Sequence, residues 1–324
     1  MNFAIIGCGL IGQKRAKSLD NNKLLYVCDI DFKKAELLSN QYKNCIPTTD
    51  VNIICNDTNV DVVIVSVINN QLYPIAFQLI KHGKHVLIEK PGSVTSNELE
   101  SLLIESKKTN SIIRIGYNHR YHPACLKSLE IIKSTDFGEI MFLRGRYGHG
   151  GRLGYEKEWR SYKNLSGGGE LIDQGVHLID LTNIFIKDFD KIDGHIHTYF
   201  WNMEVEDNAF ISLQNKKGNV AWLHVSCTEW KNTFSFEIYG KNAKLHWEGL
   251  GGSYGIERLT YYKMLPEMGP PETIIYEYPM VDNSWKIENQ EFIKDVKLKR
   301  QSIPGLIEGI KVLKVVERLY KKDL

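Results

Sequence analysis

The chain has 324 residues, with 41 lysine and arginine residues against 39 aspartate and glutamate residues and a formal net charge of +2. This near balance gives no reason to expect a nucleic acid or an anionic membrane as a partner. With 43% hydrophobic and 25% charged residues, the composition excludes disorder and collagen-like repeats. No apolar run approaches the roughly 20 residues of a membrane-spanning helix. We therefore expect a cytoplasmic protein of two domains.

The six cysteines and ten histidines show no metal-binding pattern. The cysteines include no C-x-x-C pair, so we expect reduced thiols. His195 and His197 are two residues apart, and a strand would place both on one face, where ordinary packing explains them. The sequence predicts no metal site.

The amino-terminal third of the chain alternates short β-branched runs with helical patterns, which is typical of βαβ units and a parallel sheet. Its apolar runs do not alternate with polar residues, because strands of such a sheet are buried on both faces. We expect Ser96 to cap the fourth helix. The expected strands cover residues 3–6, 24–28, 62–67, 85–88 and 112–115, and the expected helices cover 11–19, 32–42, 72–82 and 96–108.

The pattern changes after about Tyr121. Between residues 191 and 278, strand-like runs are separated by short turn signals, which predicts an antiparallel sheet with one solvated face. Before this region we expect a helix over 123–133, a strand over 139–147 and a helix over 170–186. Two more helices, over 285–298 and 304–320, close the chain.

Gly7, Gly9 and Gly12 form a G-x-G-x-x-G string directly after the first expected strand. Gly7 permits a tight turn, Gly9 lets a pyrophosphate approach the backbone, and Gly12 allows close helix packing. The amino end of the following helix adds free N–H groups and a partial positive charge. In this context the string predicts a dinucleotide site, which also includes Leu10 and Ile11.

Asp29 follows the second expected strand, 17 residues after Gly12. A carboxylate at this place accepts hydrogen bonds from the ribose of adenosine. It also repels a 2′-phosphate, so the sequence favours NAD over NADP. The alternative is a glycine turn of an unrelated α/β protein, with Asp29 as a helix cap. For Asp31, we favour a role as the cap of the next helix over a shared role at the ribose.

Lys90 comes directly after the strand expected over 85–88. Ligands of open α/β sheets bind at the carboxyl ends of the strands. Desolvation beside a nicotinamide would favour the neutral amine and let Lys90 pass a proton. The alternative is a structural lysine.

Asp173 and His177 follow a glycine run at residues 167–169 and are four residues apart in a helical pattern. This spacing places a carboxylate and an imidazole on one helix face. An imidazole that titrates near neutral pH suits the conversion of an alcohol to a ketone. The alternative is an ordinary surface pair.

In this order, the motifs make the chain resemble the Gfo/Idh/MocA family of sugar and cyclitol oxidoreductases. The resemblance covers essentially the whole chain and includes G-Y-N-H-R-Y-H-P, which ends at Pro123. It implies an α/β fold: a Rossmann domain with a parallel sheet at 1–121, and an α+β domain with an open, largely antiparallel sheet at 122–324. The last helix is able to pack back on the first domain. A homodimer or homotetramer through the second sheet is expected.

The resemblance also implies roles for single residues. His177 removes the proton of a hydroxyl while hydride passes from its carbon to NAD, and the reverse reaction reduces a ketone. Lys90 hydrogen-bonds the same oxygen, and Asp173 orients His177 or binds a neighbouring hydroxyl. Asn118 bridges the cofactor domain to the substrate, and Glu89 lines the nicotinamide ribose.

One segment departs from the family pattern of proline-asparagine followed by histidine. Here the proline and histidine positions hold Ile68 and Leu72, while the asparagine persists as Asn69. The role of that histidine has no counterpart in this chain. Ser66 and Asn69 stay candidates for contact with the cofactor.

The stretch between Arg144 and Gly169 is rich in arginine and aromatic residues. Arginine binds carboxylate or phosphate, and aromatic faces stack on sugar rings or bases. The composition fits an anionic or nucleotide-linked sugar, and it fits equally a loop held by cation–π and surface contacts. The candidate substrate residues are Asn118, Arg120, Arg146, His149, Arg152, Trp159, Arg160, Asp173 and His177.

Three functions agree with these motifs. The first is an NAD-dependent dehydrogenase or reductase of a sugar, sugar acid or nucleotide sugar. The second is a redox-assisted glycosidase, in which NAD oxidises a hydroxyl transiently and no NADH accumulates. The third is a non-catalytic NAD-binding regulator, against which the intact Lys90, Asp173 and His177 argue.

Overall fold

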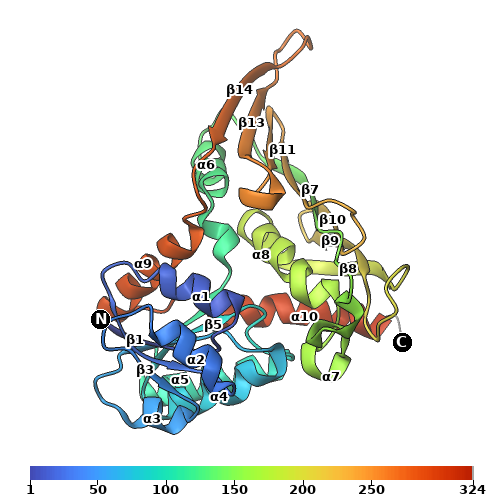
Figure 1. The fold of residues 1–324 in the computed structure, drawn as a ribbon. Coiled ribbons are helices and arrows are strands. Elements are labelled where there is room, and N and C mark those ends of the chain that lie inside the picture. The colour runs from blue at the N-terminus through green and yellow to red at the C-terminus, as the bar shows by residue number, and fades with distance from the viewer. Residues whose placement is uncertain (323–324) are drawn as a thin grey trace. The chain divides into compact units, whose positions relative to one another are not determined.

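The computed structural model describes residues 1–322 and shows two compact units (Figure 1). Unit 1 comprises Met1–Asn118, Asn164–Gly167 and Trp285–Lys314, and unit 2 comprises His119–Lys163, Gly168–Ser284 and the chain from Val315 onward. No helix within residues 1–322 is long and apolar enough to cross a membrane. The domain boundary near Tyr121 stays a prediction, which limited proteolysis tests.

Unit 1 is built on a six-stranded sheet in the order β3-β2-β1-β4-β5-β6, and every strand pair is parallel. The order reverses between β1 and β4, and ligands of such sheets bind at this switch point. All four residues of β4 are buried, as expected for a central parallel strand. The strands are β1 (Asn2–Ile6), β2 (Lys23–Cys28), β3 (Ile46–Thr48), β4 (Val62–Val65), β5 (His85–Glu89) and β6 (Ile113–Gly116).

Helices α1 to α5 connect these strands, and α9 joins them from the far end of the chain (Figure 1). Phe292 and Val296 of α9 belong to the same apolar core as Phe3 and Ile64 of the sheet. The helices are α1 (Leu10–Lys17), α2 (Phe32–Ser39), α3 (Val51–Asn56), α4 (Asn69–Lys81), α5 (Ser96–Thr109), α9 (Ser284–Lys297) and the first part of α10 (Leu306–Lys322).

The predicted cap of α5 is wrong by one residue. Thr95, not Ser96, accepts the backbone N–H of Glu98, and the Glu98 carboxylate accepts the backbone N–H of Thr95. This reciprocal capping box satisfies two N–H donors at once, whereas Ser96 is already the first helical residue. The sequence reading also missed β3 and α3, whose three and six residues are too short to show a period.

Unit 2 contains an eight-stranded sheet in the order β14-β13-β12-β11-β7-β10-β9-β8. All pairs are antiparallel except β7 with β10. Helices α6 (Pro123–Ile132) and α8 (Val176–Phe185) pack on this sheet (Figure 1). The strands are β7 (Ile140–Gly148), β8 (Phe189–His197), β9 (Asn208–Asn215), β10 (Val220–Ser226), β11 (Thr233–Gly240), β12 (Ala243–Glu248), β13 (Glu257–Lys263) and β14 (Glu272–Tyr278).

Burial along β11 alternates residue by residue, with Phe234, Phe236 and Ile238 turned inward. This is the pattern of a sheet with one face packed and one face solvated. The predicted fold class, a parallel Rossmann sheet followed by an open and largely antiparallel sheet, is therefore confirmed.

The segment expected as one regular helix over 170–186 is not regular. Its first part, Leu171–Gly175, is a π-helix (η4), and α8 begins only at Val176. No local pattern in the sequence reveals this irregular start, where the Glu206 carboxylate from another segment accepts the backbone N–H groups of Gly169 and Leu171. The preceding stretch contains the short elements η2 (Tyr155–Lys157), η3 (Trp159–Ser161) and α7 (Lys163–Ser166).

Candidate active site

In the turn between β1 and α1, Gly7 and Gly12 are closely packed, whereas the backbone at Gly9 is open. A Cβ atom on Gly7, whose φ is +94°, would lie 2.4 Å from the carbonyl oxygen of Ser66. A Cβ atom on Gly12 would lie 1.9 Å from the carbonyl oxygen of Gly7. At Gly9 a Cβ atom would meet nothing within 4 Å. Gly7 and Gly12 are thus required by packing, while Gly9 leaves the backbone accessible to a pyrophosphate.

Ser66 and Asp29 both bind the backbone of this turn. The Ser66 hydroxyl donates to the carbonyl of Gly7 at 2.8 Å, and the Asp29 carboxylate accepts the N–H of Cys8 at 2.8 Å. Asp31 instead caps α2 by accepting the N–H of Lys33 at 3.1 Å, as predicted. The donors and the carboxylate of this turn fit a dinucleotide with a free ribose diol.

Asn69 and Glu89, two predicted cofactor residues, make firm contacts within unit 1. The Asn69 side-chain amide donates to the carbonyl of Ser166 at 2.8 Å. Glu89 forms an ion pair with Arg15 at 2.5 Å, and Arg15 also lies 2.7 Å from Glu288. Arg15 and Glu288 are completely buried. The sequence reading missed this buried cluster, and contact of Asn69 and Glu89 with the cofactor stays a prediction.

Lys90 follows Glu89 at the carboxyl end of β5, and Asn118 begins the short helix η1 (Asn118–Tyr121). Both residues belong to unit 1, whereas Asp173 and His177 belong to unit 2. Lys90 therefore occupies the predicted place in the sheet.

Asp173 and His177 lie on either side of the junction between the π-helix and α8. Both are buried, with 8% and 4% of their surfaces exposed, so the surface-pair alternative does not hold. Arg160 donates from Nε to the Asp173 carboxylate at 3.1 Å. Arg160 was predicted to bind substrate, and here it holds the candidate catalytic carboxylate.

The His177 imidazole lies in a cluster of aromatic rings. Its centroid is 3.9 Å from that of His119, edge to face, and 6.0 Å from that of Tyr147. His119 in turn stacks on Phe234 at 5.8 Å. Such a cluster fixes the orientation of the imidazole.

Glu170 is a second buried carboxylate near Asp173, and the sequence reading missed it. It accepts the hydroxyl proton of Tyr155 at 2.9 Å and lies 3.5 Å from Nε2 of His149. In the neutral imidazole of His149, Nδ1 accepts the N–H of Gly151 at 3.0 Å, so the proton sits on Nε2. Burial opposes charge on His149, but Glu170 and Asp173 outweigh it and raise the pKa of His149. The sequence did offer one signal for Glu170, because it is an acidic residue in the largely apolar segment that also carries Asp173.

The arginines predicted to recognise an anion already have carboxylate partners within unit 2. Arg120, a further candidate substrate residue, likewise binds Asp180 through two bonds of 2.7 and 2.6 Å. Trp159 stacks with Arg160, whose guanidinium is 4.6 Å from the ring centroid. The arginine count alone therefore does not require an anionic substrate. The other pairs are Arg146 with Glu229 and Arg152 with Glu158.

Within residues 1–322, no group of three histidine, cysteine, aspartate or glutamate side chains is arranged to hold a metal ion. His195 and His197 are both exposed on β8. The six cysteines carry no disulfide.

Two family models match consecutive parts of the chain. Residues 1–117 match the GFO/IDH/MocA model described as an oxidoreductase family with an NAD-binding Rossmann fold. Residues 126–246 match the C-terminal domain of the same family.

Relatives and solved structures of this family match nearly the whole chain. D-glucoside 3-dehydrogenase of Escherichia coli K12 is 25% identical over 99% of this chain and 95% of its own. The scyllo-inositol 2-dehydrogenase (NADP(+)) IolW of Bacillus subtilis 168 is 22% identical over 96% of this chain and 92% of its own. Levoglucosan dehydrogenase in complex with NADH and levoglucosan shares the fold, with a TM-score of 0.88 at 18% identity over 99% and 96% of the two chains. The chain therefore belongs, as its motifs predict, to the Gfo/Idh/MocA family of oxidoreductases, and its Rossmann unit binds NAD.

Proposed function

We propose that the chain is an NAD-dependent dehydrogenase that interconverts a secondary alcohol and a ketone on a sugar-type ring. The observation that carries this proposal is the buried pair Asp173 and His177 at the junction of a π-helix with α8. Burying ionisable groups costs free energy, and such groups cluster at functional sites, where π-helical turns also recur. The two relatives described above are dehydrogenases by name.

His177 is the proposed base that takes the proton of the reacting hydroxyl. NAD, when bound, accepts the hydride from the carbon that bears this hydroxyl. Lys90 donates a hydrogen bond to the same oxygen, and Asp173 orients His177 or binds a neighbouring hydroxyl. Arg160 keeps the Asp173 carboxylate in place through the bond of 3.1 Å. General acid–base catalysis of this kind contributes roughly 10²–10⁴-fold to the rate.

A neutral ring is the favoured substrate. The arginines of unit 2 are already paired with carboxylates, so their number gives no support for an anionic substrate. Tyr147 and Phe234 belong to the buried ring cluster that holds His177, which gives the proposed base an apolar environment. Glucosides and inositols are the compounds in the names of two relatives.

A substrate panel tests the proposal. The purified protein is incubated with NAD and methyl β-D-glucopyranoside, levoglucosan, myo-inositol or UDP-N-acetylglucosamine, and NADH is followed by its absorbance. We expect steady NADH formation with at least one of the three neutral compounds. Turnover of the nucleotide sugar alone would contradict the neutral substrate. NADH released in a fixed amount only after denaturation would contradict net dehydrogenation and indicate an internal redox cycle.

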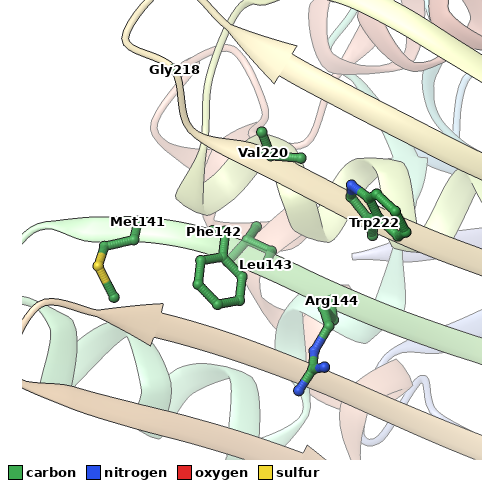
Figure 2. A pocket seen from close by; sticks show the side chains of 7 residues that line it. All are labelled: Met141, Phe142, Leu143, Arg144, Gly218, Val220 and Trp222. Atoms are coloured by element: carbon green, nitrogen blue, oxygen red, sulfur yellow. The ribbon is translucent and has the colours of Figure 1, made fainter.

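We further propose that the outer face of the unit 2 sheet joins copies of the chain. Trp222 and Phe210 on this face are 68% and 41% exposed. Trp222 of β10 and Phe142 and Arg144 of β7 line a hollow of about 430 Å³. Figure 2 shows how their side chains lie on the two strands. Exposed aromatic residues around a hollow are typical of interfaces. The hollow is lined by Met141, Phe142, Leu143, Arg144, Gly218, Val220 and Trp222.

The Trp222→Glu variant tests this interface. A buried unpaired carboxylate would separate the copies, so analytical ultracentrifugation should show an oligomer for the wild type and a monomer for the variant. Leu153→Glu, at a fully exposed apolar residue of the loop before η2, is the control. A monomeric wild type, or an oligomer that survives Trp222→Glu, would exclude this face.

A further inference from the structure

We infer that Glu206 and Tyr320 are positioning residues for the π-helical turn that carries Asp173. Glu206 binds the backbone at the start of this turn, and Tyr320, near the end of α10, holds Glu206. The inference rests on the proposed function, because the turn matters for catalysis only if Asp173 belongs to the active site. The inference adds Glu206 and Tyr320, which lie far from Asp173 in the sequence, to the residues that support the proposed active site.

Glu206 acts as an anionic cap supplied from outside the helix. One carboxylate oxygen accepts the N–H of Gly169 at 3.0 Å, and the other accepts the N–H of Leu171 at 3.0 Å. Free N–H groups at a helix start carry partial positive charge and bind anions. The cap usually comes from the residue before the helix, but Glu170 occupies that place and makes no side-chain cap bond.

Tyr320 completes the set of donors to Glu206. Its hydroxyl donates to the Glu206 carboxylate at 2.8 Å. Burial and the charge of Glu206 hold the pKa of Tyr320 well above its ordinary value, so the hydroxyl remains protonated. The Glu206 carboxylate thus receives two backbone donors and one phenol donor, which together offset the cost of burying its charge.

The glycine run before the turn is explained by the same two residues. A Cβ atom on Gly168 would lie 1.9 Å from the Tyr320 hydroxyl oxygen. A Cβ atom on Gly169 would lie 1.9 Å from the carbonyl oxygen of Glu206. Side chains at these positions would push Tyr320 and Glu206 away from the turn. The close approach therefore requires glycine at both positions.

The charge state of Glu206 couples the turn to pH. Burial raises the pKa of Glu206, while the bonds from Tyr320, Leu171 and Gly169 lower it and only partly compensate. The neighbouring carboxylates do not share these donors: Asp207 accepts the N–H groups of Tyr199, Phe200 and Trp201, and Glu170 binds Tyr155. Removing the Tyr320 hydroxyl therefore raises the pKa of Glu206 further, so that Glu206 becomes protonated at a higher pH.

Hydrogen exchange of the whole protein tests the inference without a substrate. Tyr320→Phe should make the amides of Gly169 and Leu171 exchange about tenfold faster, which is the loss expected for one bond to a buried charged group. Glu206→Gln should have a larger effect, because it removes the negative charge and replaces one accepting oxygen with an NH₂ group that cannot accept a backbone N–H. After correction for intrinsic exchange, the pH below which protection is lost should be higher in Tyr320→Phe than in the wild type.

Tyr26→Phe is the matched control, because the Tyr26 hydroxyl donates to the Asp57 carboxylate at 2.8 Å in unit 1. It should leave exchange at residues 168–176 unchanged. Equal protection and an equal pH dependence in Tyr320→Phe and Tyr26→Phe would overturn the inference. A His177→Ala variant with near-normal turnover would overturn the proposed function instead, so the two failures are distinguishable. With methyl β-D-glucopyranoside and NAD, we expect Tyr320→Phe to lower kcat more than it changes KM.

Discussion

At the scale of single residues, two glycines of one turn have opposite surroundings. A Cβ atom on Gly12 would lie 1.9 Å from the carbonyl oxygen of Gly7, and one on Gly9 would meet nothing within 4 Å. Gly12→Ala should therefore destabilise the fold by about 1–3 kcal/mol through overpacking. Gly9→Ala should keep the wild-type stability but weaken NAD binding, because its methyl group lies where the pyrophosphate approaches.

Chemical denaturation and NAD titration of both variants separate the two roles. A Gly9→Ala protein that is destabilised would show that Gly9 is also required for packing. A Gly12→Ala protein with unchanged stability would show that the turn relaxes at no cost.

His149 makes stability depend on pH in a defined direction. Its pKa is raised in the folded protein, chiefly because Glu170 and Asp173 outweigh the effect of burial. A raised pKa adds stability that is fully present below the unfolded value of about 6.5 and is lost as the pH rises through the folded value. His149→Gln should therefore cost more stability in acid than in mildly alkaline solution.

Urea unfolding across this pH range, for the wild type and His149→Gln, measures the difference. His195→Gln, at an exposed histidine of β8, is the control and should show no such trend. A cost for His149→Gln that is constant with pH would mean that His149 is neutral in the folded protein throughout.

At the scale of elements, a buried ion cluster ties α9 to the Rossmann sheet. Arg15 of α1 pairs with Glu89 of β5 at 2.5 Å and with Glu288 of α9 at 2.7 Å. Arg15→Met should destabilise the protein by about 3–5 kcal/mol, because it leaves two carboxylates buried without their partner. Arg258→Met breaks an exposed pair with Glu277 and should cost under about 1 kcal/mol.

Thermal or urea unfolding of these two variants, and of Arg15→Met combined with Glu288→Gln, completes this test. The second substitution should restore part of the stability, because it removes a buried charge. Equal losses for Arg15→Met and Arg258→Met would show that the buried cluster contributes no more than a surface pair.

Elements with a strong local signal were predictable, and elements fixed from outside were not. The buried β-branched strand β4 and the glycine turn before α1 follow from residues within a few positions of one another. The start of the π-helix Leu171–Gly175 binds Glu206, which lies on a different segment, and no periodicity within the helix reveals this contact. The Thr95 cap was missed because adjacent threonine and serine are equally good candidates by sequence.

Within the candidate site, the sequence identified the candidate catalytic residues but not the ion-pair partners of the arginines. Asp173 and His177 were identified from their spacing and from the family motif, and both are buried. The arginines were interpreted as anion binders because a sequence shows their number but not their partners. Arg160 bound to Asp173 and Arg120 bound to Asp180 show that these charges are already neutralised within unit 2.

At the scale of the whole molecule, the positive and negative charges that nearly cancel in number also lie close together in the structure. The local concentration of arginine in residues 144–160 is matched by acidic partners, including Glu229, Glu158 and Asp173. The chain combines a unit that binds NAD with a unit that presents a buried imidazole among aromatic rings.

The central claim is that His177 is the base of an NAD-linked dehydrogenation. The most direct measurement is the kcat of NADH formation by wild type and His177→Ala, with the panel compound that the wild type oxidises. Thermal unfolding of both proteins verifies that the variant is folded. The account predicts a fall in kcat of at least about 100-fold, the lower range for loss of a general base. A folded His177→Ala protein with near-normal kcat would contradict it.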